Sequence, residues 1–390
     1  MMSFEAHALA TWDDEGGTVR TRVAPPTTPL ELDVSSNESV ELLDGGEAAY
    51  PRMLAAIADA KRTLDLEVYA FSPFGVGAAF IEAIGSAAAR GVVCRVVIDG
   101  WGSARGGRTV AAALRARGCH VVVYHRLLAL MIGRFGRNHR KILLVDDEVA
   151  FLGGINIGDQ YMSRGVRVGW ADLALVIHGP QCARLGSMIR REPPRVAPGS
   201  VQIELCGLAG GWRLRRRYID AFVEARRRIH IAHGYFLPDL GILRAITAAA
   251  RRGVEVKLLL AGGKNMPFSN AAARSLHRRL LSAGVTIHEW NDSVLHAKVA
   301  TVDGQRLLVG SFNLDPFSLA NLEALVTVDD RHVVAQVEGW IRAHLALAQP
   351  MTTVEASSWR RRWLIDPFGR VVAKVAVIMS RIMGRRHRSG

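Results

Sequence analysis

Amphipathic stretches and short apolar runs alternate along this 390-residue chain. Between residues 47 and 62 the apolar side chains recur at helical spacing, and residues 64–71 have the composition of a strand. A further helix is predicted through Phe80 and Ile84. Residues 92–100 then form a continuous apolar run, which is typical of a strand buried in a parallel sheet. The alternation predicts an α/β fold in which helices cover a sheet.

The same succession recurs in the second part of the chain. A helix is predicted near residues 218–228, a strand over 229–236, then another helix and a strand over 254–262. The helix-end sequences also match, because AAARGV ends at Val92 and AAARRGV ends at Val254. The chain is therefore an internal duplication with a period of about 160 residues, which is too long for a solenoid. Each half is expected to form its own α/β sandwich.

Changes in composition mark the ends of the two halves. The first 34 or so residues place several prolines among Thr and Val, which is typical of poorly ordered chain, and EPPRVAPGS has the composition of a linker. The predicted divisions are a lead-in over 1–34, a first half over 35–191, a linker over 192–200, a second half over 201–350 and a basic tail over 351–390.

One motif occurs once in each half. Residues 139–156 are HRKILLVDDEVAFLGGIN and residues 296–313 are HAKVATVDGQRLLVGSFN, so both follow the template H-x-K-x4-D-x6-G-[GS]-x-N. Side chains two positions apart lie on the same face of a strand. His139 and Lys141 therefore share one face, and so do His296 and Lys298 in the second half.

The acidic residue of each motif falls where the strand is expected to turn. Asp146 and Asp303 belong to the catalytic motif by position, but we expect them to stabilise a hairpin with Asp147 and Gly304 rather than to react. After the turn, the chain returns towards the His–Lys end.

The returning strands complete a set of polar groups suited to a phosphodiester. They bring back Asn156 and Asn313, and we group these two with Ser311 as phosphate-binding residues. Lysine is otherwise rare, since the chain has six lysines and 44 arginines, yet two of the six occupy equivalent motif positions. A compact ammonium suits a phosphate oxygen. Each half thus offers an imidazole, an ammonium and a carboxamide.

Composition limits the possible partners and cofactors. The net charge of +14 favours a polyanion, either nucleic acid or an anionic lipid surface. The four cysteines lack the close spacing of a zinc or redox site, so buried thiols are expected and no metal is predicted. The chain begins without a secretory signal pattern and has no apolar stretch long enough to span a bilayer, so a soluble or peripheral protein is expected.

The paired motifs resemble those of the phospholipase D superfamily. Their flanking sequences, NESVELLDGGEAAYPRML, DGWGS, GYFLPD and GSFNLDPFSLANLEA, are similar to those of bacterial cardiolipin synthases. The resemblance runs from about Asn37 to Leu345 and is strongest to the subtype without N-terminal transmembrane helices. It implies a duplicated α/β fold with a pseudo-twofold axis and one active site at the interface between the halves.

The resemblance also implies a two-step reaction without a metal or other cofactor. One histidine attacks phosphorus and forms a phosphohistidine, while the other protonates the leaving alcohol and later deprotonates the acceptor. By similarity, His139 is the nucleophile and His296 the general acid. Asp172 and Glu323 occupy the places of carboxylates that orient the two histidines, and surface acids near strands are the alternative explanation.

Two segments favour a lipid substrate over nucleic acid. Residues 125–137, HRLLALMIGRFGR, place apolar side chains beside arginines just before the first motif, and a packed helix is the alternative. Residues 359–390 have the pattern of a basic amphipathic helix that lies on an anionic membrane, although a flexible nucleic-acid-binding arm or a disordered tail would also be basic. Nucleic acid would favour exposed stacking aromatics.

We therefore expect a phosphatidyltransferase that uses phosphatidylglycerol and makes cardiolipin or a related lipid. The expected partner is an anionic phospholipid membrane, at the cytoplasmic face of the bacterial inner membrane, and no nucleic acid is expected. A monomer would suffice, since both half-sites are on one chain. The alternatives are a phospholipase D-type hydrolase or nuclease, and a non-catalytic membrane-binding protein of the same fold.

Overall fold

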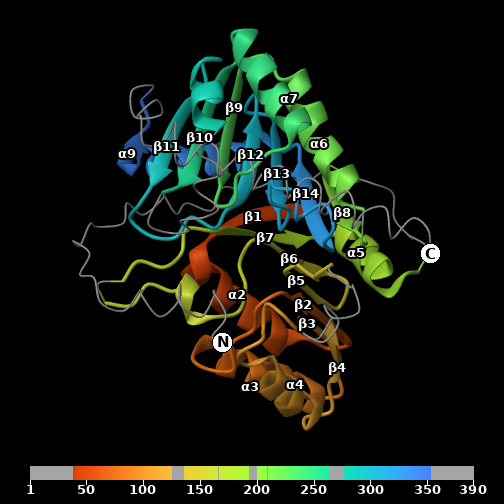
Figure 1. Cartoon of the computed structure of the whole chain (residues 1–390). Coiled ribbons are helices and arrows are strands. Elements are labelled where there is room, and N and C mark those ends of the chain that lie inside the picture. Colours follow the sequence, from red (N-terminus) through yellow and green to blue (C-terminus); the bar gives the residue numbers. More distant parts are fainter. Residues whose placement is uncertain are drawn as a thin grey trace.

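The computed structural model describes six stretches of the chain (Figure 1), namely residues 38–124, 136–165, 167–192, 200–208, 210–262 and 276–352. Several predicted segments fall outside them. These are the lead-in, most of the apolar–arginine segment before the first motif, most of the linker and the amphipathic tail.

The first half is built on a seven-stranded sheet with the order β1-β7-β6-β5-β2-β3-β4. Strand β2 runs parallel to β3 and antiparallel to the central strand β5, so the motif strand β5 lies beside the first strand of the βαβ unit. The elements are β1 (Ser39–Asp44), α2 (Gly45–Asp59), β2 (Thr63–Val68), α3 (Val76–Ala89), β3 (Val93–Asp99), α4 (Gly107–Arg115), β4 (His120–Tyr124), β5 (Ile142–Val145), β6 (Val149–Gly153), the short 3-10 helix η2 (Asp159–Tyr161), β7 (Leu173–His178) and α5 (Pro180–Arg190).

The second half repeats this plan on an eight-stranded sheet with the order β15-β11-β10-β9-β12-β13-β14-β8. Strand β12, which begins at the motif lysine, is antiparallel to β9 just as β5 is to β2. The elements are β8 (Val201–Cys206), α6 (Gly211–Glu224), β9 (Arg228–His233), α7 (Leu240–Arg251), β10 (Glu255–Ala261), β11 (Thr286–Trp290), β12 (Lys298–Val302), β13 (Arg306–Gly310), β14 (Glu323–Val328), α9 (Arg331–Leu347) and β15 (Gln349–Pro350).

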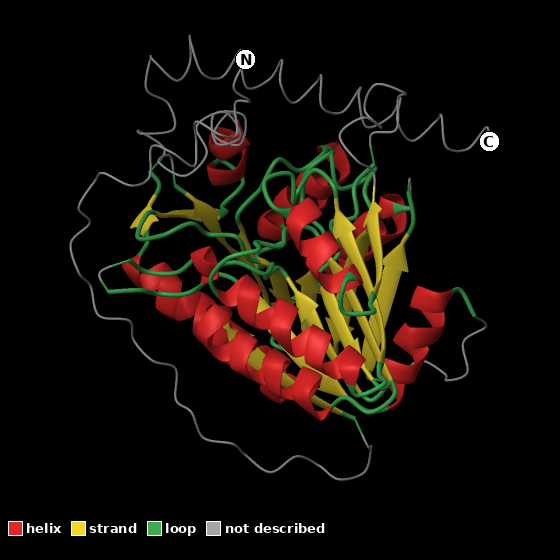
Figure 2. Cartoon of the chain, turned by 90° about the horizontal axis from the view of Figure 1, so that it is seen from below, coloured by secondary structure: helices red, strands yellow, loops and turns green. Residues whose placement is uncertain are grey.

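Three apolar cores hold the layers together, and Figure 2 shows the strands enclosed between helices. One core lies under α2, α3 and α4 on the first sheet, and another lies under α6 and α7 on the second. The third joins side chains of both sheets with α5 and α9, so it packs the halves against each other. The predicted fold class, a duplicated α/β arrangement, is confirmed.

Element ends differ from the sequence-based expectation by a few residues. The strand predicted over 64–71 ends at Val68, because the next backbone groups leave the ladder for side-chain partners. The Ser103 hydroxyl donates to the Tyr69 carbonyl, and the Ala70 N–H donates to the Asn156 side-chain oxygen. The chain therefore turns out of the sheet beside the first motif.

The two motif hairpins have tight two-residue turns. Asp146 and Asp147 have φ of 55° and 60°, and Asp303 and Gly304 have φ of 56° and 68°, which is the backbone conformation of a type I′ turn. Asn, Asp and Gly tolerate this region best. Among the described residues, no helix is both long and apolar enough to cross a bilayer.

Candidate active site

Each motif histidine is fixed by backbone contacts to the opposite half. The His139 N–H donates to the Leu322 carbonyl at 2.9 Å, and the His296 N–H donates to the Ala171 carbonyl at 2.8 Å. Leu322 and Ala171 directly precede Glu323 and Asp172 in the chain. The docking of the halves therefore brings each histidine to a carboxylate of the other half.

His139 lies in a pocket made mainly by the second half. Its Nδ1 is 3.1 Å from Glu323 Oε2 and 3.1 Å from the Ser311 carbonyl oxygen. Both neighbours are acceptors, so Nδ1 carries the proton and Nε2 is left with the lone pair. The Tyr69 ring contacts the imidazole edge-on, with ring centroids 4.8 Å apart.

His296 has a matching carboxylate and a more aromatic surrounding. Its Nδ1 lies 2.6 Å from Asp172 Oδ2 and 3.4 Å from the Tyr161 hydroxyl. The rings of Trp170 and Tyr235 lie 5.5 and 5.9 Å from the imidazole centroid. Asp172 thus holds this ring as Glu323 holds the other, and a carboxylate on the far nitrogen supports a transient imidazolium.

The lysines lie directly beside the histidines. Lys141 Nζ donates to the His139 carbonyl at 2.6 Å, and Lys298 Nζ donates to the His296 carbonyl. Burial lowers the pKa of Lys141 to about 7 and that of Lys298 to about 8, and the charge of Lys298 further lowers the pKa of Lys141. The two ammonium groups therefore share one electrostatic environment, although they come from different halves.

The histidines share the same environment. Burial lowers the pKa of His139, and both lysines add to this effect against the pull of Glu323. Burial and then Lys298 lower the pKa of His296 to about 3, although Asp172 opposes the shift. In the free enzyme both imidazoles are therefore neutral near pH 7. An anion bound between the lysines would raise the pKa values of both histidines again, since a negative charge favours the protonated imidazoles.

The Ser311 side chain is engaged by the second half's carboxylate. Its hydroxyl donates to Glu323 Oε2 and accepts from the Ala324 N–H, so its single proton holds the carboxylate rather than a phosphate. The first half has Gly154 at the equivalent position, where a Cβ would lie 2.2 Å from Asp172 Oδ1. The GG and GS variants of the motif thus fit two carboxylates of different length.

The two motif asparagines are also unequal. The Asn156 amide nitrogen donates to the Tyr161 hydroxyl at 2.9 Å, and its oxygen accepts from the Ala70 N–H at 3.1 Å. Asn313 is buried, and its side-chain oxygen has no hydrogen-bond partner within the described residues. Asn313 thus has more capacity for a ligand, while Asn156 helps to fix Tyr161 beside His296.

Asp146 and Asp303 lie at the far ends of the motif strands. The Asp146 carboxylate accepts the N–H groups of residues 61–63, and Asp303 accepts those of residues 226–228. Burial alone would raise the pKa of each group, but these hydrogen bonds outweigh it and the net pKa is lowered. The structure places both acids at the predicted turns, away from the histidines.

A residue inside the first motif ties the halves together. The Arg140 guanidinium donates to the Cys206 carbonyl at 2.7 Å and to Glu67 Oε2 at 3.2 Å, and Asn138 donates to the same carboxylate. The second motif has Ala297 at this position. The hydrogen bonds of Arg140 therefore fix the loop that carries His139, and the second motif has no equivalent of them at this position.

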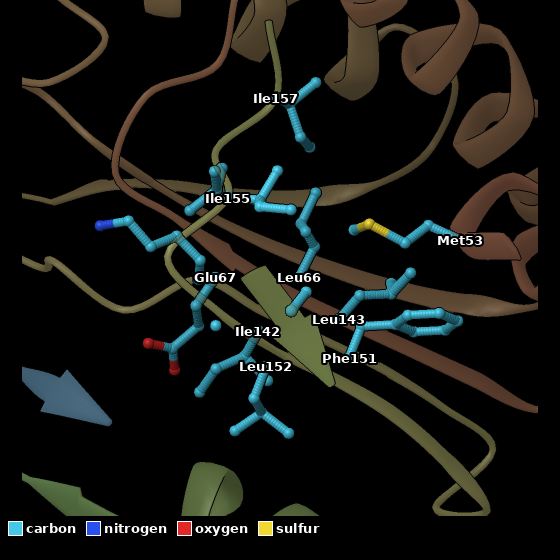
Figure 3. Close-up of a pocket in the computed structure, with 13 residues that line it drawn as sticks. Met53, Leu66, Glu67, Ile142, Leu143, Phe151, Leu152, Ile155 and Ile157 are labelled. Carbon is cyan, nitrogen blue, oxygen red and sulfur yellow. The ribbon is translucent and has the colours of Figure 1, made fainter. Parts of the chain in front are cut away.

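A small cavity lies behind Lys141 (Figure 3). Its walls are largely aliphatic and aromatic, with Met53, Leu66 and Phe151 pointing towards one another, and Glu67 lies at one edge. All of its lining residues belong to the first half, and Lys141 is the one that it shares with the active site. The apolar wall excludes water from the stem of Lys141, in agreement with the low pKa of this ammonium.

Sequence reasoning missed the aromatic walls of the site. Tyr69 and Tyr235 fall near the ends of the strands predicted over 64–71 and 229–236, and in the structure they lie just after the ends of β2 and β9. Tyr161 and Trp170 lie in loop sequence without a recognisable pattern. Within the described stretches, no group of three or more His, Cys, Asp or Glu side chains could hold a metal ion.

Comparison with known proteins identifies the family. The family described as "Cardiolipin synthase, PLD-like domain" matches residues 53–184 and 218–345. Cardiolipin synthase B of Escherichia coli (strain K12) is 34% identical over 322 residues, covering 75% of this chain and 77% of that protein. Cardiolipin synthase of Geobacillus kaustophilus is 30% identical over 327 residues, covering 76% and 65% respectively.

A solved structure shares the fold. The crystal structure of phosphatidylserine synthase from Haemophilus influenzae Rd KW20 aligns with a TM-score of 0.68 at 16% identity, covering 88% of this chain and 94% of that one. The family match spans both half-copies and includes both histidines with their partner carboxylates. The chain therefore belongs to the cardiolipin synthase family of phospholipase D-like proteins.

Proposed function

We propose that this phosphatidyltransferase moves a phosphatidyl group from phosphatidylglycerol to the hydroxyl of a second phosphatidylglycerol or a related alcohol. The product is cardiolipin or a related phospholipid. The observation that carries the proposal is the exchange of carboxylates between halves, which gives two oriented imidazoles in one site with two lysines. The relatives named as cardiolipin synthases support the lipid substrate.

In the first step, His139 Nε2 attacks phosphorus and the bond from phosphorus to the leaving glycerol oxygen breaks. His296, which takes up a proton when the bound diester anion offsets the charge of Lys298, supplies the proton that this oxygen gains. In the second step, the acceptor hydroxyl gives its proton to His296, its oxygen attacks phosphorus, and the phosphorus–nitrogen bond breaks. Lys141, Lys298 and Asn313 face the charge on the equatorial oxygens, and such stabilisation is often the largest catalytic contribution.

The surroundings of the two imidazoles support this division of roles. His139 Nδ1 has both a carboxylate and a carbonyl as acceptors, which keeps Nε2 unprotonated and nucleophilic. His296 sits among three aromatic rings, whose faces attract a cation. The diester anion would offset Lys298, the group that lowers the pKa of His296 most after burial.

The function is tested by incubating purified full-length protein with vesicles of labelled phosphatidylglycerol. Cardiolipin and free glycerol in equal amounts are the expected products. Phosphatidic acid alone would show that water is the acceptor and that the chain is a hydrolase. Absence of lipid turnover, together with cleavage of DNA, would contradict the lipid substrate.

The low pKa values of the lysines predict the pH dependence. Lys141 and Lys298 lose their protons as pH rises through about 7 and about 8, and the neutral amines no longer attract the diester anion. We therefore expect kcat/KM, which reports the free enzyme, to fall above this range. Lys141→Arg stays protonated and should move the alkaline limb upwards. A profile that is flat up to the ordinary lysine pKa of 10.5 would contradict the depressed values.

We also propose that the enzyme works as a peripheral protein on an anionic membrane, at the cytoplasmic face of the bacterial inner membrane. The net charge of +14 supports attraction to such a surface. The family's lipid chemistry supports the same location, because the substrate is held in a bilayer. A monomer contains both half-sites, so the proposed reaction needs no second copy.

A further inference from the structure

The proposed reaction requires a second phosphate to be bound. The transferred phosphate lies between the histidines, but a phospholipid acceptor brings a phosphate of its own. In the product the two phosphates are joined by three carbons and two oxygens, a reach similar to two residues of extended chain, roughly 6–7 Å. A cation at that distance from His139 would select such an acceptor.

Arg137 is at that distance along the chain. The Leu322 N–H donates to the Arg137 carbonyl at 2.8 Å. The N–H of His139, two residues after Arg137, donates to the Leu322 carbonyl at 2.9 Å. This pattern holds the segment extended beside the second half, as the parallel bridge at Asn138 shows. Alternate residues of an extended segment share a face, so Arg137, His139 and Lys141 emerge on the same side.

The guanidinium is positioned by an aromatic ring. Its Cζ lies 4.0 Å from the centroid of the Trp101 ring, which is within the distance of a cation–π contact. Trp101 belongs to the same wall as the site, because neighbouring Gly102 packs so closely on Tyr69 that a Cβ would lie 2.7 Å from that ring. The Tyr69 ring in turn contacts His139.

One donor of this guanidinium has no protein acceptor. Arg137 Nη1 is buried and has no hydrogen-bond partner within the part of the chain that the structure describes. The nearby carboxylate of Asp99 already accepts the N–H groups of Trp101, Gly102 and Asn138. A buried donor without a hydrogen-bond partner is destabilising, so an external acceptor is favoured here.

The second half has no such group. In its motif the residue two positions before His296 is Val294, which is buried. Among the described residues, the position two before the motif histidine therefore carries a cation on the His139 side and an apolar side chain on the His296 side. This matches a reaction in which one phosphate is transferred and only one other phosphate must be held.

We infer that Arg137 binds the phosphate of the acceptor phospholipid and so selects that acceptor over neutral alcohols. The inference rests on the proposed transfer reaction. Two parallel N–H···O bonds from a guanidinium to a phosphate give both charge and orientation.

The test compares three acceptors in one assay with vesicles of phosphatidylglycerol as donor. The vesicle lipid itself gives cardiolipin, labelled glycerol gives labelled phosphatidylglycerol, and labelled glycerol 3-phosphate gives its phosphatidyl ester. In Arg137→Gln the ratio of cardiolipin to glycerol product should fall by about 10- to 100-fold, which is the range for loss of a charged hydrogen bond. The glycerol 3-phosphate product should fall in the same proportion.

Arg52→Gln is the matched control. It removes the same charge from an exposed arginine that pairs with Glu41, and its product ratio should equal that of the wild type. Arg137→Lys, which keeps the charge but not the planar fork, should give an intermediate ratio.

An unchanged ratio in Arg137→Gln, or an equal loss of all three products, would overturn the subsite. Loss with phosphatidylglycerol but not with glycerol 3-phosphate would also overturn it, since Arg137 would then contact the lipid surface rather than the phosphate. A wild-type enzyme that exchanges glycerol without making cardiolipin would overturn the proposed acceptor as well.

Discussion

His296→Ala is expected to lower cardiolipin formation by at least about 10³-fold and yet to form the covalent intermediate from an activated donor. Without this imidazole, neither the leaving glycerol oxygen nor the acceptor hydroxyl has a proton partner. A nitrophenyl ester of phosphatidic acid has a leaving group that needs no proton. His139 can then attack it, but no base activates the acceptor, so the enzyme stops after one turnover.

The measurement is the burst of nitrophenol on mixing. The His296→Ala enzyme should release about one equivalent and retain the phosphatidyl label on the protein, in an acid-labile linkage typical of phosphohistidine. His139→Ala should release no burst and retain no label. The reverse result would exchange the roles of the two histidines. Near-normal turnover by either variant would contradict a shared site.

Asp172→Asn is expected to reproduce the His296 defect, although Asp172 belongs to the first half. The carboxylate is fully buried and lies 2.6 Å from His296 Nδ1. An asparagine can stabilise neither the correct tautomer nor the imidazolium, and such changes lower kcat by roughly 10²- to 10⁴-fold. With the nitrophenyl donor, the variant should keep the burst and lose the following turnovers.

Glu323→Gln should show the opposite pattern. Its carboxylate holds His139 Nδ1, so the variant should lose the burst itself. Asp146→Asn is the matched control, because Asp146 belongs to the motif but accepts only backbone N–H groups at the hairpin. Asp146→Asn should lower the melting temperature and leave kcat nearly unchanged. A loss of burst in Asp172→Asn would show that the carboxylates are not exchanged between halves.

Local spacing explains which parts of the site could be predicted from the sequence. A strand period of two places His and Lys together, and a two-residue turn places Asp146 and Asp303 at the hairpins, so these positions follow from short-range rules. The helix and strand order of each half follows from periodicity for the same reason. Element ends were less certain, because side chains such as Ser103 and Asn156 take backbone groups out of the β2 ladder.

The pairing of acids with histidines could not be read from spacing. Asp172 and His296 are 124 positions apart, and His139 and Glu323 are 184 apart, so their contact depends on how the halves dock. The hydrogen bond from the Ser311 hydroxyl to Glu323 could not be predicted from the motif either. Nothing in the sequence around Tyr161 shows that this side chain meets the site.

The exchange of carboxylates has a consequence for the newly made protein. His139 is synthesised early, but its partner Glu323 emerges from the ribosome 184 residues later. Until then His139 in the nascent first half has no carboxylate to orient it. Lys141 beside it likewise lacks the second lysine, Lys298. The shared site is incomplete in such a chain. The complete site therefore forms only after the second half has been synthesised and the two halves have docked.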